Sequence, residues 1–398
     1  MHEVFLSLSV YEERARRIRT YLKNNDCRAL LVFTGDYVIY TTGFSIDVAT
    51  WERPVAVVLP LDSEPFMVLN ELSTYHHGFA LERKTCWVED ASFYVEHPRL
   101  TNRKYTVLQW TDLVADRMKA AGLVRGRVAV DTVGAVPAGL RASLPDLQFV
   151  SAAELLRDMR NVKCPEERQI LHMCGEVSDY GQKLMRERFR SGRILTEIAY
   201  EVTWEMSKYA LEKYPEDKIE VRARAFCGGR YTASPHGSGA HAGLKIAEHD
   251  IIIDFTNCFM NDYSVENERT FIVGKPTDEE ARAFRTMVEA QKRATEMLVE
   301  GRRMADVDGA AQRVIEMAGY GDYIMHRTGH GRGLQGHEYP TDLAFNNSLL
   351  VEGVCITPEP GIYIGHIGGF RHSDTVLVGK TAPDSCTKFP RELEDLTV

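Results

Sequence analysis

The segments HRTGHGRGLQGHEYP at residues 326–340 and TPEPGIYIGHIGGFRHSD at residues 357–374 decide how this chain is interpreted. They place His330 and His337 seven residues apart, and Glu359 lies twenty-nine residues after His330. Glycines on both sides of His330 let the backbone approach a bound group closely. We therefore take this region as the first candidate site.

Carboxylates upstream belong to the same pattern. The apolar run DIIID ends at Asp254, which is typical of a buried strand that delivers a carboxylate to a cleft. In YSVENERTF (263–271), strand alternation places Ser264, Glu266 and Glu268 on one face. We expect Asp254, Glu266, Glu268 and Glu359 to converge on one cavity, which then needs a compensating positive charge.

Length and composition limit the class of protein. At 398 residues the chain is long for one core, so two domains are expected. A net charge of −9 without a Lys/Arg-rich run argues against nucleic acid or an anionic membrane as partner. No stretch of about 18 uninterrupted apolar residues is present to span a bilayer. Eight scattered cysteines without a CxxC pair indicate reduced thiols of a cytoplasmic protein.

The order of elements divides the chain. Helix and strand alternate up to LQFV (147–150), which predicts a compact α/β domain over residues 1–155. A long amphipathic stretch broken at Pro165 opens a second domain, residues 156–398. In this second domain we expect helices over residues 195–213, 277–299 and 304–318 and strands over residues 251–256 and 268–274.

The motifs after residue 225 closely resemble the creatinase/prolidase/aminopeptidase P family, the pita-bread hydrolases. The resemblance implies an α+β fold, with a C-terminal pita-bread domain and a smaller N-terminal α/β domain. It also implies a homodimer in which the N-terminal domain of one subunit helps to close the site of the other. TTGFSIDVATWERP (41–54) is then the lid-forming loop.

The resemblance assigns metal-ligand positions residue by residue. In metal-dependent members five side chains hold two ions, and Asp254, Glu266, His330 and Glu359 stand at four of these positions. Ser373 stands where a carboxylate should bridge both ions. Because this bridge is missing, we expect no metal cofactor. The alternative is a divalent Mn, Co, Zn or Fe ion on the four remaining positions.

Other residues receive roles in catalysis or substrate binding from the same resemblance. His236, in TASPHGSG, matches a proton-shuttling histidine, with His241 as a substitute. His337 matches a histidine that contacts the substrate, and Glu268 matches an active-site glutamate of creatinase. We also expect Tyr263 and Arg371 to line the site. Tyr263 opens the Tyr-x-x-Asp-like motif, and Arg371 shares the face of Ser373 and could meet an anionic group.

The leading hypothesis is a creatinase-like hydrolase that cleaves a C–N bond in a small, cationic, nitrogen-rich solute without a metal. His236 would act as general base, while Glu268 and Glu359 would hold the cationic group. The alternatives are a metallopeptidase of the Xaa-Pro type with a reduced metal site, a lyase acting on a betaine or sulfonium solute, and a non-catalytic binding module.

Overall fold

The structure is a computed structural model that describes residues 6–96, 104–237 and 239–398. It has an N-terminal unit, Met1–Arg160, and a C-terminal unit, Asn161–Val398. Arg160, in the last turn of α6 (Ala153–Asn161), forms an ion pair with Asp36 of the N-terminal unit. That pair keeps α6 with the N-terminal unit.

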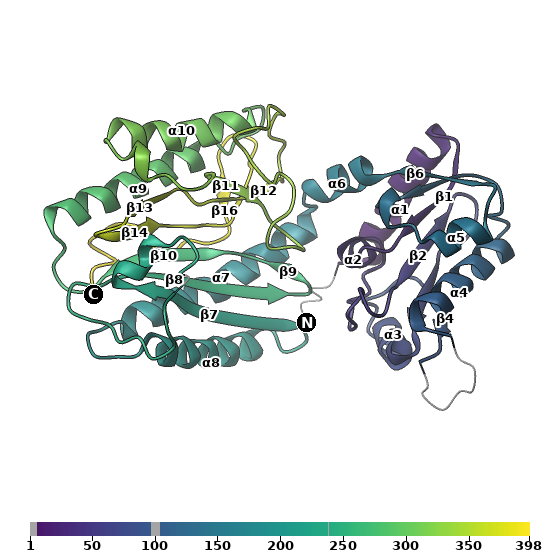
Figure 1. The fold of residues 1–398 in the computed structure, drawn as a ribbon, viewed down its shortest axis with the longest axis horizontal. Helices are drawn as coiled ribbons and strands as arrows, with labels where there is room; N and C mark the ends of the chain where they lie inside the picture. Colours follow the sequence, from purple (N-terminus) through teal and green to yellow (C-terminus); the bar gives the residue numbers. More distant parts are fainter. Residues whose placement is uncertain (1–5, 97–103, 238) are drawn as a thin grey trace. The chain divides into compact units, whose positions relative to one another are not determined.

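The N-terminal unit is built on a six-stranded mixed sheet. In the order β4-β3-β2-β1-β5-β6, its strands are β4 (Asp90–Tyr94), β3 (Phe66–Asn70), β2 (Ala56–Pro60), β1 (Cys27–Val32), β5 (Gly126–Val130) and β6 (Leu147–Ser151). The other helices are α1 (Leu8–Asn24), α2 (Gly35–Thr42), α3 (Thr74–Glu82), α4 (Thr106–Ala120) and α5 (Ala138–Ser143). They lie around this sheet (Figure 1).

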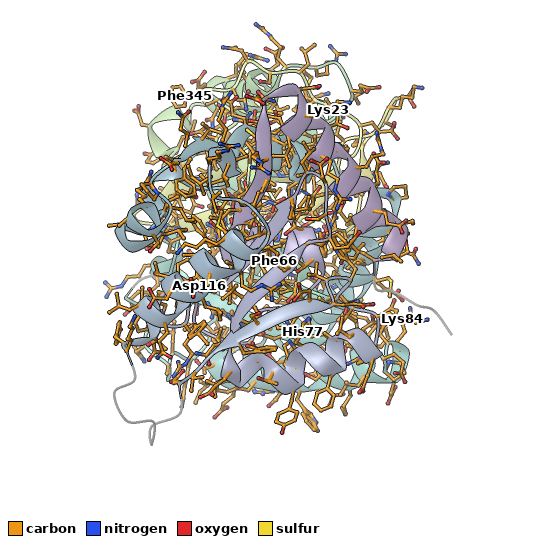
Figure 2. The ribbon with its side chains drawn as sticks, turned by 90° about the vertical axis from the view of Figure 1, so that its right-hand side faces the viewer. Lys23, Phe66, His77, Lys84, Asp116 and Phe345 are labelled. Atoms are coloured by element: carbon orange, nitrogen blue, oxygen red, sulfur yellow. The ribbon has the colours of Figure 1, made fainter. Side chains whose placement is uncertain are left out.

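The core of this unit follows from its patterning. Strands β2 and β3 are buried at every position, as expected for apolar strands covered on both faces. Helix α4 contributes Trp110, Val114 and Met118, which recur at helical spacing and pack on the sheet. Phe66 lies within these layers, whereas Lys23 lies at the surface (Figure 2). No helix in the described ranges is both long enough and apolar enough to cross a membrane.

The first half of the C-terminal unit pairs two long helices with a sheet. Helices α7 (Pro165–Arg188) and α8 (Leu195–Lys213) pack against one face of strands β7 (Ile219–Gly228), β8 (Ile251–Met260), β9 (Tyr263–Ser264) and β10 (Asn267–Ile272) (Figure 1). Pro165 begins α7, where its fixed φ suits the first helical turn. The opposite face of this sheet is therefore available to the second half of the unit.

The second half adds two helices and short strands. The helices are α9 (Asp278–Glu296) and α10 (Met304–Met317), close to their expected bounds. The strands are β11 (Gly329–Gly331), β12 (Cys355–Pro358), β13 (Gly361–Ile364), β14 (Gly368–Arg371), β15 (Val376–Leu377) and β16 (Asp384–Ser385). Single 3-10 turns are η1 (Glu71–Ser73), η2 (Val133–Ala135), η3 (Gly229–Ala233) and η4 (Gly321–Tyr323).

A two-residue turn sets the register of the β8 hairpin. Asn261 and Asp262 both have positive φ, 49° and 71°, and Met260 pairs with Tyr263 across them. The same register continues along the ladder, so that Asp254 lies opposite Arg269 and Phe255 lies opposite Glu268. Because opposite residues share a face, Asp254 and Glu268 lie on different faces of the sheet.

Candidate metal centre

Backbone pairing joins the two halves of the C-terminal unit at β10. The Glu268 amide donates to the Ser373 carbonyl at 2.9 Å, and the Ser373 amide donates back to the Glu268 carbonyl at 3.1 Å. The Thr270 hydroxyl also bonds both the amide and the carbonyl of Arg371. This pairing places Glu266 and Glu268 beside Arg371 and Ser373, on the sheet face away from α7 and α8.

Strand β11 delivers His330 to the same place. His330 pairs with Thr357 of β12, and the Glu359 amide donates to the Thr328 carbonyl at 2.5 Å. Strand β11 is tightly enclosed, because a Cβ on Gly331 would lie 2.3 Å from the carbonyl oxygen of Tyr339. The glycine is therefore required for this close approach, and His330 is held in one position.

Glu266, His330 and Glu359 together form a group that can hold a metal ion. One ligand atom from each lies within 4.8 Å of the other two, and His330 Nε2 is 3.4 Å from Glu359 Oε1. His330 Nδ1 is 2.9 Å from the Gly331 carbonyl oxygen, which requires Nδ1 to carry the ring proton. Nε2 is left with its lone pair, as in a metal-ligating histidine oriented by a backbone carbonyl.

The charges of these groups depend on burial and on one arginine. Burial lowers the pKa of His330 to about 4, so the ring is neutral at pH 7. Burial raises the pKa of Glu359 well above its ordinary value, and the charge of Glu266 adds to the rise. Burial alone would raise the pKa of Glu266 too, but the neighbouring Arg332 guanidinium brings it below its ordinary value. A buried site that favours protonated Glu359 is short of positive charge, which a divalent ion would supply.

Two arginines are already paired with the other oxygens of this region. Arg371 Nε and Nη2 donate to both oxygens of Glu268, at 2.5 and 2.9 Å. Arg332 Nη1 donates to Glu266 Oε2 at 2.6 Å, and the Ser373 hydroxyl donates to Glu266 Oε1 at 2.8 Å. Glu268 therefore cannot hold a cationic substrate, as the creatinase-like hypothesis requires, unless Arg371 first leaves it.

Three further aromatic side chains surround the group. His337 stacks on His330 with ring centroids 3.7 Å apart, and Arg327 Nη2 donates to His337 Nδ1 at 3.0 Å. Tyr363 links Arg371 to His326, because its hydroxyl accepts from Arg371 Nη1 at 3.2 Å and lies 2.8 Å from His326 Nε2. Burial lowers the pKa of His326 to about 4, so this ring is neutral as well.

Two of the residues expected at the site lie elsewhere. Asp254 lies on the α7 side of the sheet, where its Oδ1 accepts from the Gln182 side chain and the Arg269 amide. The hydroxyl of Tyr263 donates to Glu167 of α7 at 2.7 Å, so it also lies on that side. Asp254 does not join the other carboxylates, because the register of β8 turns it to the opposite face.

The expected proton shuttle lies at the edge of the group. His236 is exposed, and the carbonyl of its neighbour Pro235 accepts from Arg371 Nη1 at 2.7 Å. His241 is exposed too. The hydrogen bond from Arg371 anchors the His236 segment beside the metal centre.

Some residues of the centre were not expected from the sequence. Arg332, His326 and Tyr363 belong to it, and Asn257 lies on the same sheet face as Phe255 and Glu268. Asn257 is 4% exposed, and its Oδ1 has no hydrogen-bond partner among the described residues. An amide oxygen is a suitable ligand for a hard divalent ion, so this orphaned atom also fits an ion-binding centre.

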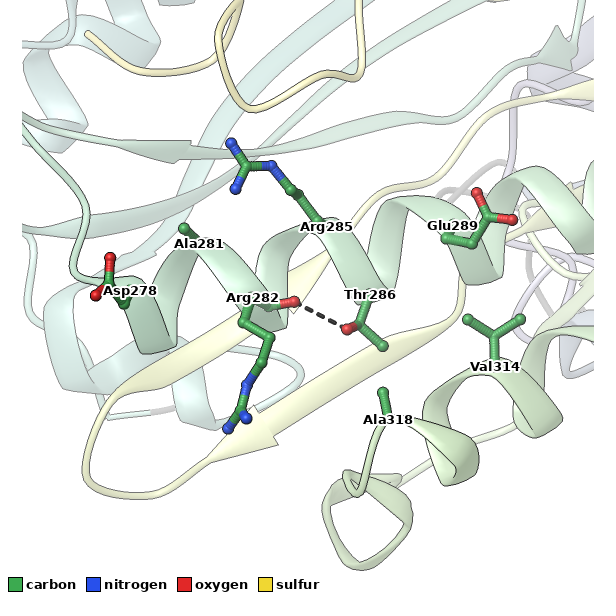
Figure 3. A pocket seen from close by; sticks show the side chains of 8 residues that line it. All are labelled: Asp278, Ala281, Arg282, Arg285, Thr286, Glu289, Val314 and Ala318. Atoms are coloured by element: carbon green, nitrogen blue, oxygen red, sulfur yellow. Dashed lines mark hydrogen bonds between the residues drawn. The ribbon is translucent and has the colours of Figure 1, made fainter.

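A groove on the outside of α9 is separate from this centre. It is lined by residues of α9 and α10, among them Arg282, Arg285 and Val314 (Figure 3). Both arginines are engaged, since Arg282 donates to the Tyr320 hydroxyl and Arg285 pairs with Glu394. Neither guanidinium is therefore free to bind a ligand in the groove.

Comparison with known proteins identifies the class. Residues 169–380 match the model of metallopeptidase family M24, and residues 14–162 match the creatinase/prolidase N-terminal domain. The chain belongs to this metallopeptidase family, has its pita-bread fold and is a hydrolase of C–N bonds. The expected fold class and family are thus confirmed.

Individual relatives carry the comparison further. A putative dipeptidase, YkvY, of Bacillus subtilis is 29% identical over 96% of this chain and 99% of its own length. An Xaa-Pro dipeptidase of Pyrococcus furiosus is 33% identical over 62% of this chain and 68% of its own length. The prolidase of Pyrococcus horikoshii shares the fold, with a TM-score of 0.76, 24% identity and coverage of 96% and 99% of the two chains.

The expectation that the protein works without a metal is wrong. The chain is a member of a metallopeptidase family, and its Glu266, His330 and Glu359 form a group that can hold an ion. The missing carboxylate at position 373 was given too much weight, because three other ligand side chains still lie together.

Proposed function

We propose that the protein is a divalent-metal-dependent dipeptidase that hydrolyses small peptides of the Xaa-Pro type. The observation that carries this proposal is the group of Glu266, His330 and Glu359, whose ligand atoms lie within 4.8 Å of one another. The kinship with an Xaa-Pro dipeptidase and a putative dipeptidase supports the choice of substrate.

Glu266, His330 and Glu359 would hold the ion, and Asn257 is a candidate for a further oxygen ligand. A bound divalent ion would polarise the scissile carbonyl and lower the pKa of a water molecule. Mn, Co, Zn and Fe all accept mixed carboxylate and imidazole ligands, so the ligand set does not select among them.

His337 is suited to hydrogen-bond the substrate. Because a guanidinium can only donate, the contact from Arg327 makes His337 Nδ1 an acceptor. The neutral ring therefore carries its proton on Nε2. Stacked on His330, this N–H is available to a carbonyl oxygen of the bound peptide.

Arg371, Tyr363 and His326 form a positioning chain. His326 Nδ1 lies 2.8 Å from the Arg327 carbonyl oxygen and must carry the ring proton, so His326 Nε2 accepts from the Tyr363 hydroxyl. Tyr363 in turn accepts from Arg371, whose remaining donors reach Glu268 and the Pro235 carbonyl. This chain holds the loop of His236, which would give a proton to the leaving amine.

The test is hydrolysis of Ala-Pro and Met-Pro, with Ala-Ala as a comparison, by protein loaded with Mn, Co, Zn or Fe ions. We expect hydrolysis of the Xaa-Pro dipeptides that is lost on chelation and restored by the ion. His330→Ala should lower kcat/KM by at least about 10²-fold through loss of a ligand, whereas His366→Ala, in the exposed β13–β14 turn, is the matched control. Failure of every loaded form to cleave an Xaa-Pro dipeptide would refute the proposed substrate class.

A further inference from the structure

Glu266 and Glu268 each form an ion pair with a buried arginine from another segment of the chain. The side chains of Arg332 and Glu266 are 2% and 8% exposed, and those of Arg371 and Glu268 are 6% and 4% exposed. Pairs this deeply buried are retained at a high cost of desolvation. Arg332 is also fixed by the carbonyls of Ser264 and Gly336, so it cannot turn away easily.

The pairs use oxygens that an additional ion would need. Both Glu268 oxygens accept from Arg371, and Glu266 Oε2 accepts from Arg332. At Glu266 Oε1 the neighbour is the Ser373 hydroxyl, which here acts as a hydrogen-bond donor and brings no negative charge. Glu266, His330 and Glu359 can together hold one ion, whereas the guanidinium groups on Glu266 and Glu268 stand where a further cation would have to approach these carboxylates.

The net charge of the cluster also favours one bound ion over two. In the ion-bound form, with Glu266, Glu268 and Glu359 ionised, both arginines charged and His330 neutral, the side chains of the cluster contribute one net negative charge. One divalent ion brings it to +1, which a bound hydroxide or a peptide carboxylate can neutralise. Another divalent ion would bring it to +3 in a buried place, where like charges repel strongly.

We propose that Arg332 and Arg371 are fixed cations that occupy the electrostatic place of an additional metal ion, so that the centre binds a single divalent ion. This inference rests on the proposed metal-dependent function but concerns the number of ions, not the substrate. Arg332 sets the capacity of the centre through its charge on Glu266, and Arg371 does so by holding Glu268.

The experiment measures ion binding and not turnover. Full-length protein stripped with a chelator is titrated with Co²⁺ by calorimetry and visible absorption, and bound metal is counted by elemental analysis after dialysis. We expect one equivalent for the wild type. Arg332→Met should bind the first ion at least tenfold more tightly, because a positive charge beside Glu266 is removed, and the double variant with Ser373→Glu should bind two equivalents.

Two further variants separate charge from structural damage. Arg332→Lys keeps the charge and should bind one ion with nearly the wild-type affinity. Arg391→Met removes a different, partly buried ion pair, that with Asp374, whose oxygens are still held by Arg269 and Gln291, and should leave ion binding unchanged. Thermal melts of each variant show whether it is folded before the titration.

Each outcome distinguishes the two proposals. Two equivalents in the wild type, or an Arg332→Met affinity equal to that of Arg391→Met, would overturn the fixed-cation proposal and leave the dipeptidase proposal intact. A wild type that binds no ion would overturn both. One equivalent without cleavage of Xaa-Pro dipeptides would overturn only the proposed substrate.

Discussion

His372 should be a source of instability that a single substitution removes. Its side chain is completely buried between Arg371 and Ser373, and neither ring nitrogen has a hydrogen-bond partner among the described residues. The Thr270 backbone approaches the ring without the geometry of a hydrogen bond, and the ring packs edge-on against Phe284 at 5.2 Å. Unpaired buried polar groups cost about 1–3 kcal/mol.

His372→Leu should therefore stabilise the protein by about 1–3 kcal/mol at pH 7.5. Leucine has a similar size and leaves no polar atom unpaired. For a unit of this size, the melting temperature should rise by roughly 2–12 °C. Thermal and urea unfolding give the measurement, and His366→Leu in the exposed β13–β14 turn is the matched control, for which we expect a small effect.

The stabilisation should grow as the pH falls. Burial lowers the pKa of His372 well below its ordinary value of 6.5, so the unfolded chain binds a proton that the folded chain does not. The part of the unfolding free energy that depends on a neutral His372 is fully present above pH 6.5 and is lost as the pH falls below 6.5. At pH 5.5 the wild type should have lost about 1.4 kcal/mol that the leucine variant keeps. If His372→Leu is less stable than the wild type, or if its advantage does not grow toward pH 5.5, the ring has a partner and the reasoning fails.

Three other substitutions test the centre and the stability of the C-terminal unit. Gly331→Ala places a Cβ 2.3 Å from the Tyr339 carbonyl oxygen, so it should cost at least about 1–3 kcal/mol of stability by urea unfolding and weaken ion binding by displacing β11. Burial raises the pKa of Asp179 from 3.8 to about 6, so the stability that its protonated form contributes is present below pH 3.8 and is lost as the pH rises through 6. Asp179→Asn should remove this pH dependence of the unfolding free energy, which amounts to at most about 3 kcal/mol. A variant with the same pH profile as the wild type would contradict this prediction. Asn257→Ala should weaken Co²⁺ binding by roughly 10–100-fold if its orphaned Oδ1 faces the ion, and an unchanged dissociation constant would exclude it as a ligand.

The sequence predicted the helices and the histidine-bearing strands well because local patterns determine them. Helices α8, α9 and α10 have bounds close to those read from apolar spacing. His330 and Glu359 do meet, since β11 and β12 pair directly. The role of Arg332 could not be predicted, because a single arginine after a glycine has no local feature that separates a buried ion pair from a solvated side chain. Its partner, Glu266, is 66 residues away in the chain.

The placement of Asp254 was different, because a usable signal was present in the sequence. Asn261 and Asp262 are residues that tolerate positive φ, and a two-residue turn centred on them fixes the whole register of the hairpin. That register puts Asp254 opposite Arg269, and alternation then separates Asp254 from Glu268. Strand alternation alone carries no such information, whereas the turn type decides which face every side chain takes. The same reasoning brings Asn257 to the face of Glu268, so the residue that this register offers in place of Asp254 is an amide and adds no negative charge. This loss of negative charge agrees with a centre in which two arginines already supply cations and only one metal ion is required.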